Sequence, residues 1–335
     1  MLILLCSLFI ASSGSAGEAV RLKGSGASFP FPLYGQWFKE YGQTHRGVII
    51  DYQAKGSGAG IRDFINKTVD FAASDAAMTD AEMQEVDVGV QVLPMAAGSI
   101  VLSYNLPGGP QELKLSRQAY AKIFLGEMAK WNDPLIAQAN PGVKMPDMDL
   151  TVVRRADASG TTFVFTQHLS AINEAWKNRY GAGTTVNWPS REKFIASPQN
   201  AGVAATIKQT PGAIGYIEYG YAEQSNMPMA LLENKAGRYV KPSLESGQAA
   251  LAGVQLPADL RAWLPDPDGE AAYPIVTYTW MLFYKKYEDA KKAETIRDVV
   301  RYCLTEGQKM SGKMGYIPLP TNVVQVVSRA LDNIH

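Results

Sequence analysis

Cysteine, histidine and an excess of one charge sign are all missing or scarce in this chain of 335 residues. It contains 2 Cys and 3 His, and its formal net charge is zero. No block of Lys or Arg stands out, so the composition gives no sign of a nucleic-acid partner or an anionic membrane surface. No cluster of Cys, His and carboxylates has ligand spacing, so neither a metal nor another cofactor is expected. Any bound anion must therefore be held by local geometry.

Long apolar runs are scarce as well, and the run at the N-terminus is short. Residues 1–16 combine this run with small residues, a pattern that resembles a secretory signal peptide cleaved after Ala16. The run is too short to span a bilayer. Leu5 precedes Cys6 where a lipoprotein site has a small residue, which argues against lipid attachment. We therefore expect export to the periplasm.

The length of the chain and its single remaining cysteine indicate how the core is organised. A chain of 335 residues exceeds what one hydrophobic core usually supports, so two domains or a bilobed domain are expected. Cys303 is the only cysteine left after signal cleavage, which excludes an intramolecular disulfide. It lies in the helical pattern IRDVVRYCL, which predicts a buried apolar role.

Strand, small-residue loop and helix follow one another repeatedly along the chain. The clearest repeats are VRLKGSGASF with the helix after it, VIIDYQAKGSGAGIRDFINKTV, VDFAASDAAMTDAEM and DLTVVRRADASGTTFVFTQHL. This alternation predicts an α/β fold with mainly parallel strands. Because such sheets bind ligands at the loops that follow the strands, these loops are the candidate sites.

The periodicity also predicts the other elements. Pro30 begins a helix whose stripe is Leu33, Trp37 and Tyr41, and Thr79 caps another helix. Further predicted elements are extended segments over 90–105 and 272–285, a helix over 116–131 capped by Ser116, and helices near 288–311 and 321–334.

The stretch RADASGTTFVFTQH, residues 155–168, has the composition of an anion socket. Arg155 and a Ser-Gly-Thr turn at a helix start are all hydrogen-bond donors. Asp157 can only accept when it is ionised. It is either a brace for the arginine or a group that reads a proton on the ligand.

Each candidate loop also has a purely structural interpretation. The loop 24–29 could be only a tight turn, and 56–60 lacks the Lys of a P-loop. Asp75 could be a helix cap, and Arg155 with Asp157 could be a surface ion pair of little energetic value. The functional interpretation rests on convergence, because all four loops lie at predicted strand ends. No histidine falls within them, so their serines lack an evident general base.

The motifs GSGASFPFPLY, YQAKGSGAGI, VDFAASDAAMTDAEM, RADASGTTFVFT, WNDPLI and IGYIEYGYA occur in this order along the mature chain. The chain thereby resembles the periplasmic phosphate-binding proteins of high-affinity phosphate ABC transporters, the PstS family. The resemblance implies a two-lobed Venus-flytrap fold, each lobe a doubly wound, mainly parallel sheet, with two hinge crossovers. It also implies that phosphate is clamped between the lobes.

The resemblance further implies a set of phosphate contacts. These are Ser28, Phe29, Ser57, Asp75, Arg155, Asp157, Ser159, Gly160 and Thr161. Hydroxyls, Arg155 and backbone N–H groups, including that of Ser159, would donate to the ligand. Asp157 would brace Arg155, and Asp75 would read the ligand's proton. Ser28 stands where the best-known members have threonine, and Gly58 where they have a second serine.

The implied organisation has one lobe at 17–100 with 274–335 and the other at 101–273, with hinge crossovers near 97–105 and 272–282. The implied function is high-affinity phosphate binding and delivery to the transmembrane permease subunits, by a monomer without enzymatic activity. Two alternatives stay open. One is a binding protein for another tetrahedral oxyanion such as sulfate or molybdate, and the other is a secreted phosphatase that uses a loop serine.

Overall fold

The structure is a computed structural model that describes residues 19–335, so the predicted signal peptide and its cleavage site lie outside the described residues. The strands are β1 (Val20–Gly26), β2 (Val48–Ala54), β3 (Phe71–Ser74), β4 (Val90–Asn105), β5 (Lys114–Leu115), β6 (Thr151–Arg155), β7 (Phe194–Ser197), β8 (Ala213–Glu218), β9 (Leu231–Glu233), β10 (Tyr239–Val240) and β11 (Val276–Tyr284). They form an eight-stranded sheet in the order β2-β1-β3-β11-β4-β8-β6-β7 and a small sheet in the order β10-β9-β5.

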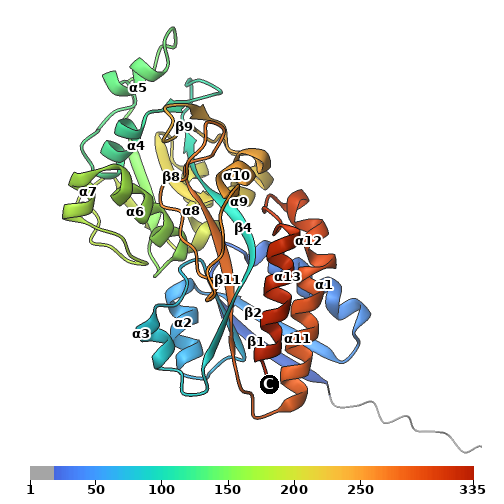
Figure 1. Cartoon of the computed structure of the whole chain (residues 1–335). Helices are drawn as coiled ribbons and strands as arrows, with labels where there is room; N and C mark the ends of the chain where they lie inside the picture. Colours follow the sequence, from blue (N-terminus) through green and yellow to red (C-terminus); the bar gives the residue numbers. More distant parts are fainter. Residues whose placement is uncertain (1–18) are drawn as a thin grey trace, which may run out of the picture.

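Helices cover the sheet on both lobes (Figure 1). They are α1 (Phe31–Thr44), α2 (Ser57–Ile65), α3 (Asp80–Gln84), α4 (Arg117–Phe124), α5 (Pro134–Ala139), α6 (Gly160–Ile172), α7 (Glu174–Arg179), α8 (Gln199–Gln209), α9 (Tyr219–Gln224), α10 (Leu244–Leu251), α11 (Ala290–Leu304), α12 (Glu306–Ser311) and α13 (Thr321–Ala330). Two short 3₁₀ helices, Gly312–Met314 and Leu331–Asn333, complete the described elements. No helix in the described part of the chain has the length and apolarity needed to cross a membrane.

The molecule has two lobes (Figure 1). In the first lobe β1 pairs in parallel with both β2 and β3, and β11 pairs antiparallel with β3. In the second lobe β6 pairs in parallel with both β7 and β8. The predicted α/β fold with mainly parallel strands in two lobes is therefore confirmed. In the large sheet the antiparallel pairings all involve β4 or β11.

Strand β4 belongs to both lobes. It pairs antiparallel with β11 from Val90 to Ser99, and with β8 from Ile100 to Asn105. The hydrogen-bonding partner therefore changes between Ser99 and Ile100. All residues of β4 between its two ends are buried, so this crossing strand lies within the core rather than over the surface.

The segment 252–275 follows α10 and contacts both lobes, and we call it the strap. Arg261 Nη1 donates to the carbonyl of Met78 at 2.7 Å in the first lobe. Asp266 pairs with Arg117 of the second lobe, with 2.7 Å between Arg117 Nη2 and Asp266 Oδ2. In Figure 1 the strap is the orange chain that descends from α10 towards α3 before β11 begins. The strap thus joins the lobes independently of β4.

Local chemistry explains the helix starts that the sequence predicts. Pro30 is the N-cap of α1, and Leu33, Trp37 and Tyr41 are buried as the stripe requires. Thr79 begins α3 with a capping box, in which its hydroxyl accepts from the N–H of Glu82. Both predictions are confirmed.

The predicted helix over 116–131 is wrong in its C-terminal half. Ser116 caps α4 as expected, but α4 ends at Phe124 and the chain turns at Gly126. Trp131 packs into the core outside this helix. Its indole Nε1 donates to the carbonyl of Gly212 at 2.8 Å, and its ring is fully buried. Tertiary packing therefore overrides the helical pattern here.

The closing helical region is divided in two. It forms α11 and α12, which meet at Thr305. The predicted helical segment near 321–334 is confirmed, as α13 followed directly by the 3₁₀ helix Leu331–Asn333. Cys303 is fully buried on α11, as its apolar setting predicts.

His168 is a buried neutral group in the second lobe. Its Nδ1 lies 2.7 Å from the carbonyl oxygen of Pro265 in the strap, and its Nε2 lies 2.9 Å from the hydroxyl of Tyr120. A carbonyl can only accept, so Nδ1 carries the proton and Nε2 accepts from Tyr120. Burial lowers the pKa of His168 to about 4.

We expect His168 to make the protein sensitive to acid. The unfolded chain binds a proton near the ordinary pKa of histidine, and the folded chain binds it only near pH 4, so stability falls as the pH drops between these values. From pH 7 to pH 4 the parent should lose about 3 kcal/mol more unfolding free energy than His168→Gln. Denaturant titrations at both pH values measure this, with the exposed His45→Gln as control. Equal losses in parent and His168→Gln would contradict the assignment.

Candidate functional site

Loops at the carboxyl ends of strands from both lobes meet between the lobes (Figure 1). The first lobe contributes the loops after β1, β2 and β3, and the second lobe contributes the turn from β6 into α6. All nine residues named from the sequence lie in these loops or at the helix starts, and they come together. Eight of them are buried, namely Ser28, Phe29, Ser57, Asp75, Arg155, Ser159, Gly160 and Thr161, and Asp157 is half-buried.

Arg155 is the cation of the site, and its side chain is 1% exposed. Its Nε donates to Asp157 Oδ1 at 2.8 Å, and Nη2 donates to Asp157 Oδ2. Nη1 donates to Thr161 Oγ1 at 3.3 Å. Burial alone raises the pKa of Asp157, but the Arg155 guanidinium outweighs burial and holds that pKa below its ordinary value. Asp157 therefore stays ionised and fixes the guanidinium.

Asp75 lies opposite, after β3, and is also buried. Its Oδ1 accepts from the hydroxyl of Thr279 at 2.8 Å, and its backbone N–H donates to Ser57 Oγ at 3.2 Å. Burial raises the pKa of Asp75 to about 7, although the Thr279 hydrogen bond and the charge of Arg155 lower it. Near neutral pH this carboxyl can therefore hold or release a proton within the site.

The start of α6 supplies backbone donors. Ser159 is the N-cap, and its Oγ accepts from the N–H of Thr162 at 3.1 Å. The first N–H groups of a helix have no acceptor within the helix, so those of Gly160 and Thr161 are available as donors at this helix start. The N–H of Ser159 differs from expectation, because it donates to the carbonyl of Thr184 at 2.8 Å. The hydroxyl is therefore the donor that Ser159 can offer.

The lobes touch directly at this point. A Cβ on Gly160 would lie 2.4 Å from Ser57 Oγ and 2.8 Å from Asp75 Oδ2, so only glycine allows this approach. Gly58 donates its backbone N–H to the carbonyl of Ala158 at 3.0 Å. A Cβ on Gly58 would lie 2.6 Å from the Cβ of Ala158. A serine at 58 would therefore press on the second lobe.

Sequence reasoning missed Gln199 and Asn200, which begin α8. Asn200 is fully buried, and its Nδ2 lies 3.1 Å from Ser28 Oγ and 3.2 Å from Thr161 Oγ1. The backbone N–H of Gln199 donates to Asp157 Oδ1 at 2.9 Å. The sequence did contain a pattern that could have identified these two residues, because β7 and α8 repeat the strand, loop and helix order of the four predicted loops.

Glu218 was also missed. It ends β8, is fully buried, and accepts from the N–H of Gly220 at 2.7 Å and of Tyr221 at 3.3 Å. Burial raises its pKa to about 8, those two hydrogen bonds oppose the rise, and the charge of Asp75 adds to it. Tyr221 also donates its hydroxyl to the carbonyl of Ser28 at 2.6 Å. A second buried carboxyl thus lies behind the site.

Nothing in the site resembles an activated nucleophile. The histidine nearest in sequence, His168, is committed to Tyr120 and Pro265. Within residues 19–335 no group of three or more His, Cys, Asp and Glu is placed to hold a metal ion. The arrangement can therefore bind and orient an anion through neutral and cationic donors, with Asp75 as a group that exchanges a proton.

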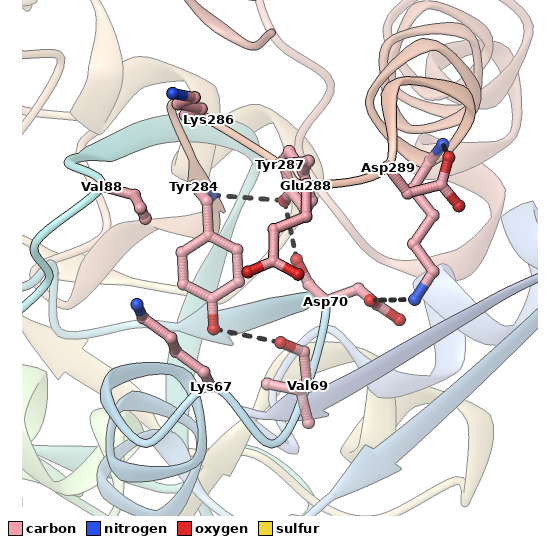
Figure 2. Close-up of a pocket in the computed structure, with 10 residues that line it drawn as sticks. Lys67, Val69, Asp70, Val88, Tyr284, Lys286, Tyr287, Glu288 and Asp289 are labelled. Carbon is pink, nitrogen blue, oxygen red and sulfur yellow. Dashed lines mark hydrogen bonds and ion pairs between the residues drawn. The ribbon is translucent and has the colours of Figure 1, made fainter.

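A separate hollow of about 510 Å³ lies on the first lobe, and Figure 2 shows its lining. Asp70 precedes β3 and Tyr284 ends β11, so the hollow lies at the opposite end of these strands from Asp75. Lys292 Nζ pairs with Asp70 Oδ1 at 2.7 Å, and the hydroxyl of Tyr284 donates to the carbonyl of Val69 at 3.1 Å. Asp70 and Tyr284 are thus already bonded to neighbouring groups in the wall of the hollow.

Known proteins with similar sequences include phosphate-binding proteins. The PBP superfamily domain matches residues 11–306. Phosphate-binding protein PstS of Xylella fastidiosa is 37% identical over 318 residues, which cover 94% of this chain and 86% of that protein. Phosphate-binding protein PstS of Pasteurella multocida is 36% identical over 327 residues, which cover 97% of this chain and 93% of that protein. The chain belongs to the PstS family.

Solved structures place this PstS-family chain in the same fold. A high affinity periplasmic phosphate-binding protein, bound with phosphate at pH 8.5, superposes with a TM-score of 0.78 at 21% identity, covering 92% of this chain and 93% of that one. A phosphate binding protein from Stenotrophomonas maltophilia superposes with a TM-score of 0.73 at 20% identity, covering 93% and 94%. At this identity the likeness shows the fold.

Glu218 should make the ligand-free protein less stable at alkaline pH. Its folded pKa of about 8 lies above the ordinary 4.5, so its contribution to stability is present below the ordinary value and is lost as the pH rises through about 8. Between pH 5 and pH 8, without phosphate, the parent should lose a few kcal/mol of unfolding free energy that Glu218→Gln retains.

The measurement is a pair of denaturant titrations at the two pH values. Glu294→Gln, an exposed glutamate on α11, is the matched control and should follow the parent. A Glu218→Gln protein whose stability changes with pH as the parent's does would show that Glu218 ionises normally in the fold.

Proposed function

We propose that this chain binds inorganic phosphate outside the cytoplasm and delivers it to the membrane permease of a phosphate ABC importer. The observation that carries the proposal is the convergence of buried donors on Asp75, a buried carboxyl whose pKa is raised to about 7. Relatives named phosphate-binding protein PstS, at 36–37% identity over most of the chain, support it. So does the structural neighbour described as periplasmic and bound with phosphate.

In this proposal the ligand lies among the residues that the sequence names. Ser28, Phe29, Ser57, Asp75, Arg155, Ser159, Gly160 and Thr161 contact it, and Asp157 acts through Arg155. Supporting this, the Arg155 contacts with Asp157 and Thr161 use part of its N–H groups, and donors on both terminal nitrogens remain. Helix N-terminal N–H groups and hydroxyls supply the remaining donors, so no net positive field is needed.

Asp75 gives the site its selectivity. Phosphate near neutral pH still carries a proton, and a phosphate hydroxyl can donate to the Asp75 carboxylate. Sulfate has no proton to give, so it would place a fully ionised oxygen against a buried carboxylate. A raised pKa supports this role, because a desolvated carboxylate gains most from a shared proton. Arsenate, which also carries protons, should be accepted.

Closure of the lobes is proposed to signal to the permease. The lobes are taken as 17–100 with 274–335 and 101–273, and the change of partner in β4 between Ser99 and Ile100 supports that division. A hinge at β4 and β11 would let the lobes separate to admit phosphate and close to bury it. We propose that the protein acts as a monomer without enzymatic activity. The signal peptide predicted at 1–16 agrees with a periplasmic location.

Arg155→Ala should weaken phosphate binding by about 3–5 kcal/mol. The change removes a guanidinium that can donate two hydrogen bonds to phosphate, and it leaves Asp157 without its ion-pair partner beside an anion. Isothermal titration calorimetry with phosphate measures the change, and circular dichroism checks the fold. Arg179→Ala is the matched control, because Arg179 forms a surface ion pair with Glu127 and is 57% exposed. Parent-like phosphate binding by Arg155→Ala would refute the site assignment.

Asp75→Asn should narrow the preference for phosphate over sulfate. The amide keeps an acceptor for the phosphate proton and adds a donor for sulfate, so phosphate affinity changes modestly, whereas sulfate affinity at pH 8 rises about tenfold or more. In the parent, sulfate should bind only when Asp75 is protonated. Its affinity should therefore fall about tenfold per pH unit above the Asp75 pKa of about 7.

Calorimetry of both proteins with phosphate and sulfate at pH 6 and pH 8 tests this pair of expectations. The variant should lose the pH dependence of sulfate binding. An unchanged preference for phosphate in Asp75→Asn would contradict the proposal that Asp75 recognises the proton of the ligand. So would pH-independent sulfate binding by the parent.

A further inference from the structure

Asn200 connects a hydroxyl of each lobe. Its Nδ2 donates to Ser28 Oγ of the first lobe at 3.1 Å and to Thr161 Oγ1 of the second lobe at 3.2 Å. Its backbone N–H donates to the same Ser28 Oγ at 3.2 Å. The side chain is fully buried, so water does not compete for these bonds.

The orientation of the Asn200 amide is fixed by its other end. Its Oδ1 accepts from the backbone N–H of Glu218 at 3.0 Å. That N–H is a donor only, so the oxygen must face Glu218 and the NH₂ group must face the two hydroxyls.

These contacts decide what the hydroxyls can do. A hydroxyl has one O–H donor and two acceptor lone pairs. Ser28 Oγ accepts from both nitrogens of Asn200, and Thr161 Oγ1 accepts from Asn200 and from Arg155 Nη1 at 3.3 Å. With the lone pairs occupied, each hydroxyl can only donate to a ligand.

The backbone at Gln199 holds this arrangement in place. Gln199 has a positive φ of 57°, which a non-glycine residue adopts only under constraint. In this conformation its N–H donates to Asp157 Oδ1 at 2.9 Å while the next N–H, that of Asn200, donates to Ser28 Oγ. Its Nε2 also donates to the carbonyl of Ala54 across the lobe boundary.

We propose that Asn200 is a positioning residue that commits Ser28 and Thr161 to donating, and thereby sets which oxygen of the ligand carries the proton. Oxygens facing these hydroxyls must be unprotonated acceptors, so the protonated oxygen of a tetrahedral oxyanion is directed to Asp75. The inference rests on the proposed function, because it concerns how the same site orients phosphate.

A double-mutant cycle tests the inference. Phosphate affinity is measured by calorimetry at pH 8 for the parent, Asn200→Ala, Ser28→Ala with Thr161→Val, and the triple variant. If Asn200 acts through the hydroxyls, Asn200→Ala weakens binding about tenfold or more in the parent and about twofold or less where both hydroxyls are absent. The same loss in both backgrounds would show a merely structural role and overturn the inference.

Asn200→Asp gives an independent readout if Asn200→Ala does not fold. A carboxylate accepts from both hydroxyls, which frees their lone pairs to accept a proton from the ligand. Phosphate binding should then favour the more protonated monoanion, so the pH of tightest binding shifts to lower pH by about one unit or more. An unshifted profile would overturn the inference.

Asn234→Asp is the matched control for the pH profile. Asn234 is a fully buried asparagine outside the site, and its Nδ2 donates to three backbone carbonyls, those of Gly269, Glu270 and Ala272. Its replacement should lower stability and leave the pH of tightest binding unchanged. A parent that does not bind phosphate defeats the proposed function and the inference together. A parent that binds phosphate without coupling or pH shift defeats the inference alone.

Discussion

Burial of charge is the constraint on which this site depends. One guanidinium, that of Arg155, faces the carboxyls of Asp157 and Asp75, with Glu218 behind them. Water has little access to Arg155, Asp75 and Glu218, and Asp157 is half-buried. Asp157 takes the direct ion pair and stays ionised. The other two carboxyls have no cation of their own, so burial raises their pKa to about 7 and about 8. A buried site with one cation and several carboxyls can accept an anion only together with protons, which is the condition that a protonated oxyanion meets.

The fold meets this constraint by bringing together groups that are far apart in sequence. Strand β4 joins the two lobes within the core, and the change of partner after Ser99 places the loops of β1 and β3 opposite the start of α6. Small residues let the loops approach, since Gly160 lies where any side chain would meet Ser57 and Asp75. The closeness of the lobes therefore depends on backbone packing, and the polar contacts are added to it.

We infer that hydrogen-bond saturation divides the donor and acceptor roles among the side chains of the site. Asn200 and Arg155 fill the acceptor sites of Ser28 and Thr161. In the proposed site these hydroxyls therefore offer protons to the ligand, and Asp75 offers a carboxyl. This division explains how a chain of zero net charge can hold an anion without a basic surface. The strap, through Arg261 and Asp266, ties the region near Asp75 to the second lobe by a path that avoids β4.

Local chemistry in the sequence determined the alternation of strand, loop and helix and the caps of α1 and α3, because each depends on neighbours a few positions away. The nine proposed contact residues came from the order of motifs that the chain shares with the PstS family. Only the tertiary structure decided that α4 stops at Phe124, since Trp131 finds its partner at Gly212. Only the tertiary structure identified Asn200, Glu218 and Thr279, whose partners are remote in the chain. The raised pKa of Asp75 was also decided by the tertiary structure, because desolvation depends on the whole surrounding fold and no short stretch of sequence encodes it.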